Sequence, residues 1–153
     1  FAVAAGNSGP ACGSASTPPG GDPAAFSVGA VNADNVVAEF SSRGPVTVDG
    51  RSITKPQLSA PGVDELSSLP GGGYGRMSGT SMAAPHVAGA VAALWSAVPE
   101  LVGDVEATGR LLRDTATPAS SENAKTSREC GSQNTIGAGV LNVAAALEAA
   151  RSR

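Results

Sequence analysis

The chain has 153 residues, of which 41% are hydrophobic, 15% charged and 3% aromatic, and its formal net charge at pH 7 is -3. This length fits one domain with a core of its own, and the hydrophobic share argues against a disordered chain. The mild acidity argues against a nucleic-acid-binding groove, which needs clustered lysine and arginine. No apolar run approaches the roughly 20 residues of a membrane span.

The chain opens on an apolar segment, residues 1–5, which we expect to be a core strand already under way at the first residue. The neighbours of such a strand would lie upstream. We therefore expect the chain to be the C-terminal portion of a longer domain, with no internal boundary.

Four more extended segments follow the opening strand. They are predicted at 25–31, 36–40, 57–60 and 63–69. The turn residues 32–35 would let the first two pair as a hairpin, and the last ends in a turn at 70–73. Residues 41–55 are predicted to be loop.

The second half of the chain is predicted to be helical. Residues 80–98 carry apolar side chains on every side, which indicates a helix buried in the middle of its domain. A second helix is predicted at 103–115, a polar surface loop at 116–135, and a final helix capped by Asn142. Strands mixed with helices indicate an α/β sheet covered by helices.

Cys12 and Cys130 are the only two cysteines, and His86 is the only histidine. These are too few for a common zinc site. Two distant cysteines suit one long-range disulfide in an oxidising compartment, and the alternative is two unrelated buried thiols.

Ser81 lies where the long predicted helix begins. Free backbone N–H groups and the positive end of the helix dipole can stabilise negative charge there, as a nucleophilic serine requires. The alternative is that Thr80 or Ser81 only caps the helix.

Asn7 follows the opening strand, at the carboxyl end where open α/β sheets bind ligands. Its side-chain amide could donate to an oxyanion. The alternative is an ordinary turn asparagine before Ser8 and Gly9.

The run Gly-Thr-Ser-Met-Ala at 79–83, continued by Pro-His-Val-Ala-Gly at 85–89, resembles the nucleophile signature of the subtilisin-like serine peptidases, the subtilases. Residues 4–7 look like the oxyanion-asparagine segment of that family. Segments 40–45, 58–62 and 139–143 match three further stretches, in the expected order.

The resemblance implies the C-terminal half of a three-layer subtilisin-like α/β fold, with a mainly parallel sheet covered by helices. It also implies a secreted serine endopeptidase that acts on polypeptide substrates. Ser81 would be the nucleophile, and the Asn7 amide would form the oxyanion hole with the Ser81 N–H. The implied substrate-binding residues are Ala4, Ala5, Gly6, Gly21 and Thr80.

Gly21 would form the base of a deep specificity pocket for bulky apolar side chains. Thr80 would assist at the oxyanion hole. Asp22-Pro23 falls where the family often has a cis-proline turn. No cofactor is implied for the chemistry. The resemblance allows a structural calcium ion but the sequence assigns it no ligands, because the carboxylates of Asp34, Asp49 and Asp64 are scattered and simple solvation accounts for each.

The catalytic Asp and His motifs of the family are absent from this sequence. His86 follows Ser81 by five residues, more than one helical turn, so we expect it to point away and reject it as the general base. The chain alone is therefore predicted to be inactive, and its implied partner is the N-terminal half of the same domain. The alternatives are a subtilase-like pseudoenzyme that serves as a binding or structural module, and an α/β-hydrolase, which Ala83 disfavours where that fold requires glycine.

Overall fold

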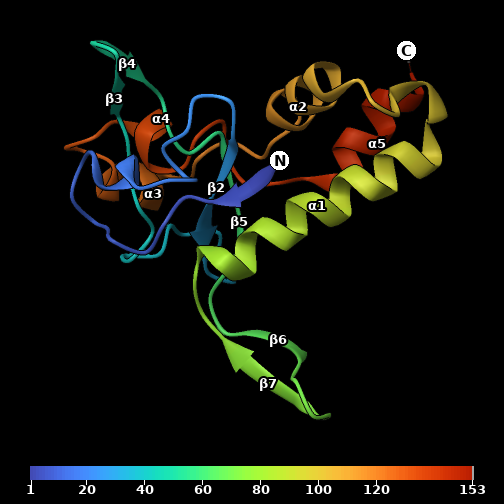
Figure 1. Ribbon diagram of the computed structural model, residues 1–153, viewed down its shortest axis with the longest axis horizontal. Helices are drawn as coiled ribbons and strands as arrows, with labels where there is room; N and C mark the ends of the chain where they lie inside the picture. The colour runs from blue at the N-terminus through green and yellow to red at the C-terminus, as the bar shows by residue number, and fades with distance from the viewer. Residues whose placement is uncertain (153) are drawn as a thin grey trace.

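The computed structural model describes residues 1–152, and its centre is a three-stranded parallel sheet (Figure 1). The strands are β1 (Ala2–Ala4), β2 (Phe26–Val31) and β5 (Leu58–Pro61), in the order β1-β2-β5. Val28 pairs with Ala4 on one side and with Leu58 on the other. The strands expected at 1–5, 25–31 and 57–60 form, but the opening strand is not buried as expected, because Ala2–Ala4 are half-buried and Phe1 is fully exposed.

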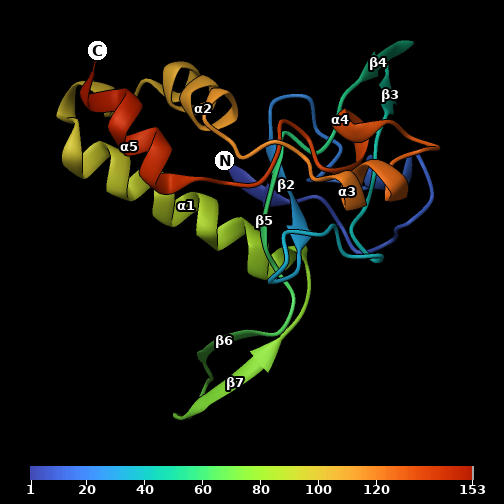
Figure 2. The ribbon, with the colours of Figure 1, turned by 180° about the vertical axis from the view of Figure 1, so that it is seen from behind.

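Helix α1 (Thr80–Ala97) covers one side of the sheet, α5 (Val143–Arg151) packs against α1, and α2 (Val105–Asp114) packs against α5. They lie together in both views of the molecule (Figures 1 and 2). Asn142 caps α5, because its Oδ1 accepts a hydrogen bond from the Ala145 N–H at 3.0 Å. Short 3-10 turns lie at Ser14–Ser16 and Pro99–Leu101. The helices expected at 80–98 and 103–115 and the asparagine cap are confirmed.

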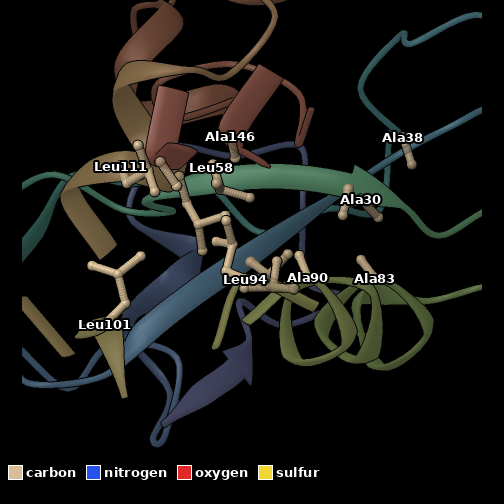
Figure 3. Close-up of a cluster of buried hydrophobic side chains, with 14 residues drawn as sticks. Ala30, Ala38, Leu58, Ala83, Ala90, Leu94, Leu101, Leu111 and Ala146 are labelled. Atoms are coloured by element: carbon tan, nitrogen blue, oxygen red, sulfur yellow. The ribbon is translucent and has the colours of Figure 1, made fainter. Parts of the chain in front are cut away.

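The main core lies between the sheet and α1 (Figure 3). Side chains alternate across a strand, so Val28, Ala30, Leu58 and Ala60 share one sheet face. They pack against the buried residues of α1, which are Thr80, Ala83, Val87, Ala90 and Leu94.

The opposite face of the sheet is also covered. Val31 packs against Ile136 and Val140, and the Ser59 hydroxyl donates to the Ile136 carbonyl oxygen at 3.1 Å. Burial on both faces is typical of a parallel sheet, and the predicted α/β class is confirmed.

The prediction that α1 is buried all round is wrong for this chain. One stripe of the helix faces the core, whereas Pro85, Ala88 and Gly89 are exposed. A Cβ added at Gly89 would meet no atom within 4 Å, so close packing within the described residues does not explain why this position is glycine. The second apolar face of α1 is open.

The expected strand at 36–40 does not form. Val31 and Val37 make only an isolated bridge, and the Ala38 N–H donates to the Ala30 carbonyl oxygen at 2.9 Å. β5 occupies one edge of β2 along residues 28–31 and β1 occupies the other along 26–28, so only the end of β2 offers an edge to an antiparallel partner.

Two hairpins project from the body. The expected loop at 41–55 contains β3 (Val46–Val48) and β4 (Arg51–Ile53), so this expectation was wrong. The expected strand at 63–69 is β6 (Glu65–Ser68), which pairs across the predicted turn with β7 (Tyr74–Met77). The β6–β7 hairpin extends well away from the sheet (Figure 1).

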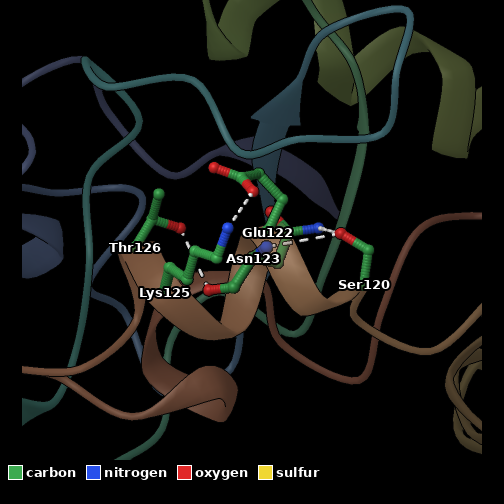
Figure 4. Close-up of polar contacts among 5 residues, drawn as sticks. All are labelled: Ser120, Glu122, Asn123, Lys125 and Thr126. Carbon is green, nitrogen blue, oxygen red and sulfur yellow. Dashed lines mark hydrogen bonds and ion pairs between the residues drawn. The ribbon is translucent and has the colours of Figure 1, made fainter.

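The segment 116–135 is not simply a loop, because it contains α3 (Ser121–Thr126) and α4 (Ser132–Thr135). Ser120 caps α3, where Lys125 also pairs with Glu122 on the exposed side (Figure 4). Buried Asn123 accepts from the Val37 N–H at 2.8 Å and donates to the Asn35 carbonyl oxygen at 2.7 Å. These contacts fix residues 35–37, where the expected turn at 32–35 meets the expected strand at 36–40.

Cys12 and Cys130 form a disulfide, with their Cα atoms 5.4 Å apart and 118 positions between them in the sequence. The open choice between a disulfide and two unrelated thiols is thereby decided for the disulfide. In the part of the chain that the structure describes, no helix has the length and apolar character needed to cross a membrane.

Candidate active site

Ser81 is the second residue of α1 and is exposed, whereas Thr80, the first residue, is fully buried. The first N–H groups of a helix have no partner inside the helix, so this end offers donors and a positive dipole. The local sequence therefore places an accessible hydroxyl at the electropositive end of an 18-residue helix.

The side chain of Asn7 reaches this helix start from the end of β1. Its Oδ1 accepts from both the N–H and the Oγ1 of Thr80, each at 2.9 Å. A backbone N–H can only donate, so it fixes which end of the amide is the oxygen. The Asn7 Nδ2 donor then lies 3.5 Å from where a Cβ on Gly79 would stand, beside the first turn of α1.

Thr80 joins the two segments of the site. Its hydroxyl accepts from the Gly6 N–H at 3.2 Å and donates to the Asn7 Oδ1. These contacts span 73 and 74 positions of sequence, so tertiary folding, not local structure, orients the Asn7 amide.

Ser42 supports the same segment from the other side. Its N–H donates to the Gly6 carbonyl oxygen at 2.9 Å, and its Oγ accepts from the Ser8 N–H at 3.0 Å. Gly6 has φ +107°, and a Cβ there would lie 2.8 Å from the Ser42 Oγ, so glycine is required. Sequence reasoning gave Ser42 no role, although the residue stands in one of the family-like segments.

The geometry limits what the expected substrate-binding residues can contribute. The N–H and C=O of Gly6 are both engaged, so this residue does not offer an open backbone edge to an extended peptide. The side chains of Ala5 and Thr80 are buried, and Ala4 is half-buried. In this structure Thr80 positions Asn7 and does not face solvent.

Gly21 is buried, and a Cβ there would lie 2.6 Å from the Ser16 carbonyl oxygen. This close backbone approach explains the glycine without reference to a deep pocket. The expectation of a cis proline at Asp22-Pro23 is wrong, because the cis peptide bonds are Gly9-Pro10, Pro18-Pro19, Gly44-Pro45 and Lys55-Pro56.

His86 and Ser81 line one hollow between β6 and the start of α1. The Nδ1 of His86 lies 2.9 Å from the Met82 carbonyl oxygen, and its Nε2 lies 3.8 Å from the Glu65 carboxylate. Both ring nitrogens therefore face partners other than the serine hydroxyl, which supports the rejection of His86 as its base.

The carboxylates considered for calcium do not form a site. Asp34 and Asp49 are exposed, and Asp64 pairs with Arg76 at 3.2 Å. Within residues 1–152, no group of three or more His, Cys, Asp or Glu side chains gathers as metal ligands would. A carboxylate-based calcium site does not fit the residues described.

Solved protease domains share the fold of this chain. The prenylagaramide maturation protease PagA superposes with a TM-score of 0.70 at 30% identity over 95% of this chain and 49% of PagA. The self-cleaved protease domain of PatA superposes with a TM-score of 0.66 at 30% identity over 97% of this chain and 49% of that domain. The fold is therefore that of a subtilisin-like protease domain.

The sequence comparisons then give the family. The model described as Subtilase family matches residues 1–139, and the chain belongs to this family. It is 40% identical over 149 residues to a subtilisin of Bacillus pumilus, covering 96% of this chain and 46% of that protein. It is 48% identical over 100 residues to subtilisin E of Bacillus subtilis (strain 168), covering 64% of this chain and 24% of that protein. The chain thus spans less than half the length of these curated relatives.

Proposed function

We propose that this chain supplies the nucleophile and the oxyanion donors of a serine endopeptidase that cleaves polypeptides. The observation that carries the proposal is the orientation of Asn7, whose Oδ1 is bound by Thr80 while its Nδ2 lies 3.5 Å from where a Cβ on Gly79, the residue before α1, would stand. An amide donor fixed in advance next to a nucleophile costs no reorganisation when negative charge develops.

In this mechanism the Ser81 Oγ gives its proton to a general base and attacks the carbonyl carbon of a peptide bond. The C–N bond then breaks, the amine product leaves with that proton, and the acyl group remains as an ester on Ser81. The Asn7 Nδ2 and the Ser81 N–H donate to the oxyanion, which the dipole of α1 also stabilises. Water then releases the acyl group. The residues that act are side chains and backbone groups of the polypeptide, so the proposed chemistry needs no cofactor.

The general base that takes the Ser81 proton comes, in this proposal, from outside these residues. His86 is the only histidine and is engaged with Met82 and Glu65. We propose that the partner is the N-terminal half of the same catalytic domain, with the catalytic Asp and His. The unpaired edge of β1 and the open apolar face of α1 support such a partner, and without it we expect an inactive chain prone to aggregate through that edge.

We also propose secretion, which the Cys12–Cys130 disulfide supports because such bonds persist in oxidising compartments. The names of the relatives point both ways, since one is a minor extracellular protease of Bacillus subtilis (strain 168) and another an intracellular serine protease of Paenibacillus polymyxa. Any calcium would be structural in the complete protein. We also predict that the pocket at Gly21 prefers bulky apolar side chains of the substrate, and substrate profiling would test this preference.

Casein hydrolysis by the complete protein tests the proposal, with Ser81→Ala as the inactive control. Asn7→Ala should lower kcat by roughly 10²–10³, a magnitude measured for the corresponding asparagine of subtilisin. A fluorophosphonate probe should label Ser81 in the complete protein and not in the isolated chain. Absence of both labelling and hydrolysis in the complete protein would favour the pseudoenzyme alternative.

A further inference from the structure

A lysine that sequence reasoning passed over is completely buried beside the loop that precedes β2. Lys55 is 0% exposed, and its Nζ donates to the carbonyl oxygens of Asp22 at 2.6 Å and Ala25 at 2.7 Å. Burying a charge is costly unless the charge is hydrogen-bonded and compensated. The buried ammonium group of Lys55 therefore indicates a structural or functional role that offsets this cost.

The loop 17–25 is otherwise bonded mainly to itself. Its N–H groups at Gly21, Asp22 and Ala25 donate to carbonyl oxygens three or four residues earlier, at 3.1 to 3.2 Å. Lys55 joins this loop to the segment before β5, 33 and 30 positions away in the sequence. The buried lysine thus ties a self-contained turn to the body of the domain.

The same loop packs against the end of β1, which leads into Asn7. A Cβ added at Gly20 would lie 2.8 Å from the Ala5 carbonyl oxygen and 2.9 Å from that of Ala4. Displacement of the loop would therefore release the backbone that positions Gly6 and Asn7.

Converging carbonyl oxygens in a loop are the ligands that Ca²⁺ and other hard cations take in proteins. Here the positive charge at their meeting point is the Lys55 ammonium. Burial lowers the pKa of Lys55, and the nearby Asp22 carboxylate opposes this shift. That carboxylate also accepts from the Ala24 N–H at 2.8 Å, so it belongs to the loop itself.

We propose that the Lys55 ammonium acts as a built-in substitute for a bound cation, so that the loop 17–25 is held in place without metal. Lys55 is then a positioning residue for the loop and, through Gly20, for the β1 end that carries Asn7. The proposal stands apart from the proposed peptidase reaction, because it concerns how the loop is held.

The test measures hydrogen exchange of peptides covering residues 17–26 in the complete protein, with EDTA and with added CaCl₂ or NaCl. In the wild type we expect the same slow exchange in all three solutions. Lys55→Ala in EDTA should exchange about tenfold faster or more, because the Ala25 carbonyl oxygen loses its donor. Added cations should reverse part of this loss by entering the vacated position.

Two further variants keep the test decisive. Lys55→Met fills the volume without charge, so its loop should exchange faster and should not respond to cations. Lys125→Ala removes the chain's other lysine, which is exposed and paired with Glu122, and should leave residues 17–26 unchanged.

The inference is overturned if EDTA accelerates exchange of 17–26 in the wild type, because a metal would then hold the loop. It is also overturned if Lys55→Ala leaves the exchange unchanged, or if the loosened loop ignores every added cation. The wild-type measurement stands even where the alanine variant fails to fold. Because exchange is read without substrate, loss of peptidase activity in any assay does not alter the outcome.

Discussion

Replacement of Thr80 by valine tests how the Asn7 amide, the proposed oxyanion donor, is oriented. Valine keeps the branched shape of threonine but removes the hydroxyl that bridges the Gly6 N–H and the Asn7 Oδ1. A buried N–H left without an acceptor costs about 1–3 kcal/mol, and the lost bond to Asn7 costs about 1 kcal/mol. Tighter apolar packing of valine offsets part of this, so we expect unfolding to require about 2 kcal/mol less.

The same substitution should also lower kcat, but by less than the factor of roughly 10²–10³ expected for Asn7→Ala. Asn7 keeps its hydrogen bond from the Thr80 backbone N–H at 2.9 Å, so only one of its two anchors is lost. About 1 kcal/mol of transition-state stabilisation corresponds to a fall of roughly fivefold in kcat with KM unchanged.

Urea unfolding and casein hydrolysis by the complete protein measure the two effects, and Thr80→Ser is the matched control because it retains the hydroxyl. A Thr80→Val protein as stable and as active as the wild type would refute the bridging role. A raised KM with unchanged kcat would instead assign Thr80 to substrate contact.

Three further predictions concern stability. Removal of the disulfide by Cys12→Ser with Cys130→Ser should lower the free energy of unfolding by about 4–5 kcal/mol in the chain-entropy treatment, as measured in urea against the oxidised protein. Leu94→Ala should cost about 2–5 kcal/mol because Leu94 is fully buried, whereas Val105→Ala, at a side chain 66% exposed, should cost under about 0.5 kcal/mol. Burial lowers the pKa of Lys55 below 10.5, so the unfolded chain binds more protons as pH approaches that value. The wild type should therefore gain stability relative to Lys55→Met as pH rises through this range, and the opposite slope would contradict the assigned shift.

Elements whose local pattern matched their environment were predictable. The apolar runs at 25–31 and 80–98 form β2 and α1 because each buries a continuous stripe against the other. The cap at Asn142 was readable because it involves only the first turn of α5.

Other elements were predicted wrongly from the sequence, for physical reasons. The run 36–40 has strand-like residues, but β1 and β5 leave only the end of β2 free to pair with it, which depends on the whole sheet. The β3–β4 hairpin did carry a local signal, Asp49-Gly50, whose positive φ angles of 50° and 74° suit a tight hairpin turn. The short helix α3 depends on Asn123, which bonds a segment more than 80 positions away.

The candidate site likewise contains residues that were predictable from the sequence and residues that were not. Family-like segments indicated Ser81 and Asn7, whereas the roles of Ser42 and Lys55 arise from contacts between distant segments. No local sequence pattern distinguishes a lysine that becomes buried from one that stays exposed. At Gly21 the sequence suggested a deep specificity pocket as the reason for the glycine. The structure gives a different reason, because a Cβ there would lie 2.6 Å from the Ser16 carbonyl oxygen.

The link between Thr80 and Asn7 has a consequence for the timing of activity. Because the amide is aimed by a residue 73 positions later in the chain, a nascent or misfolded polypeptide has a serine but no oriented donor beside it. Under the proposed mechanism, a polypeptide that has not yet brought residues 7 and 80 into contact would therefore lack the oriented donor that its serine needs.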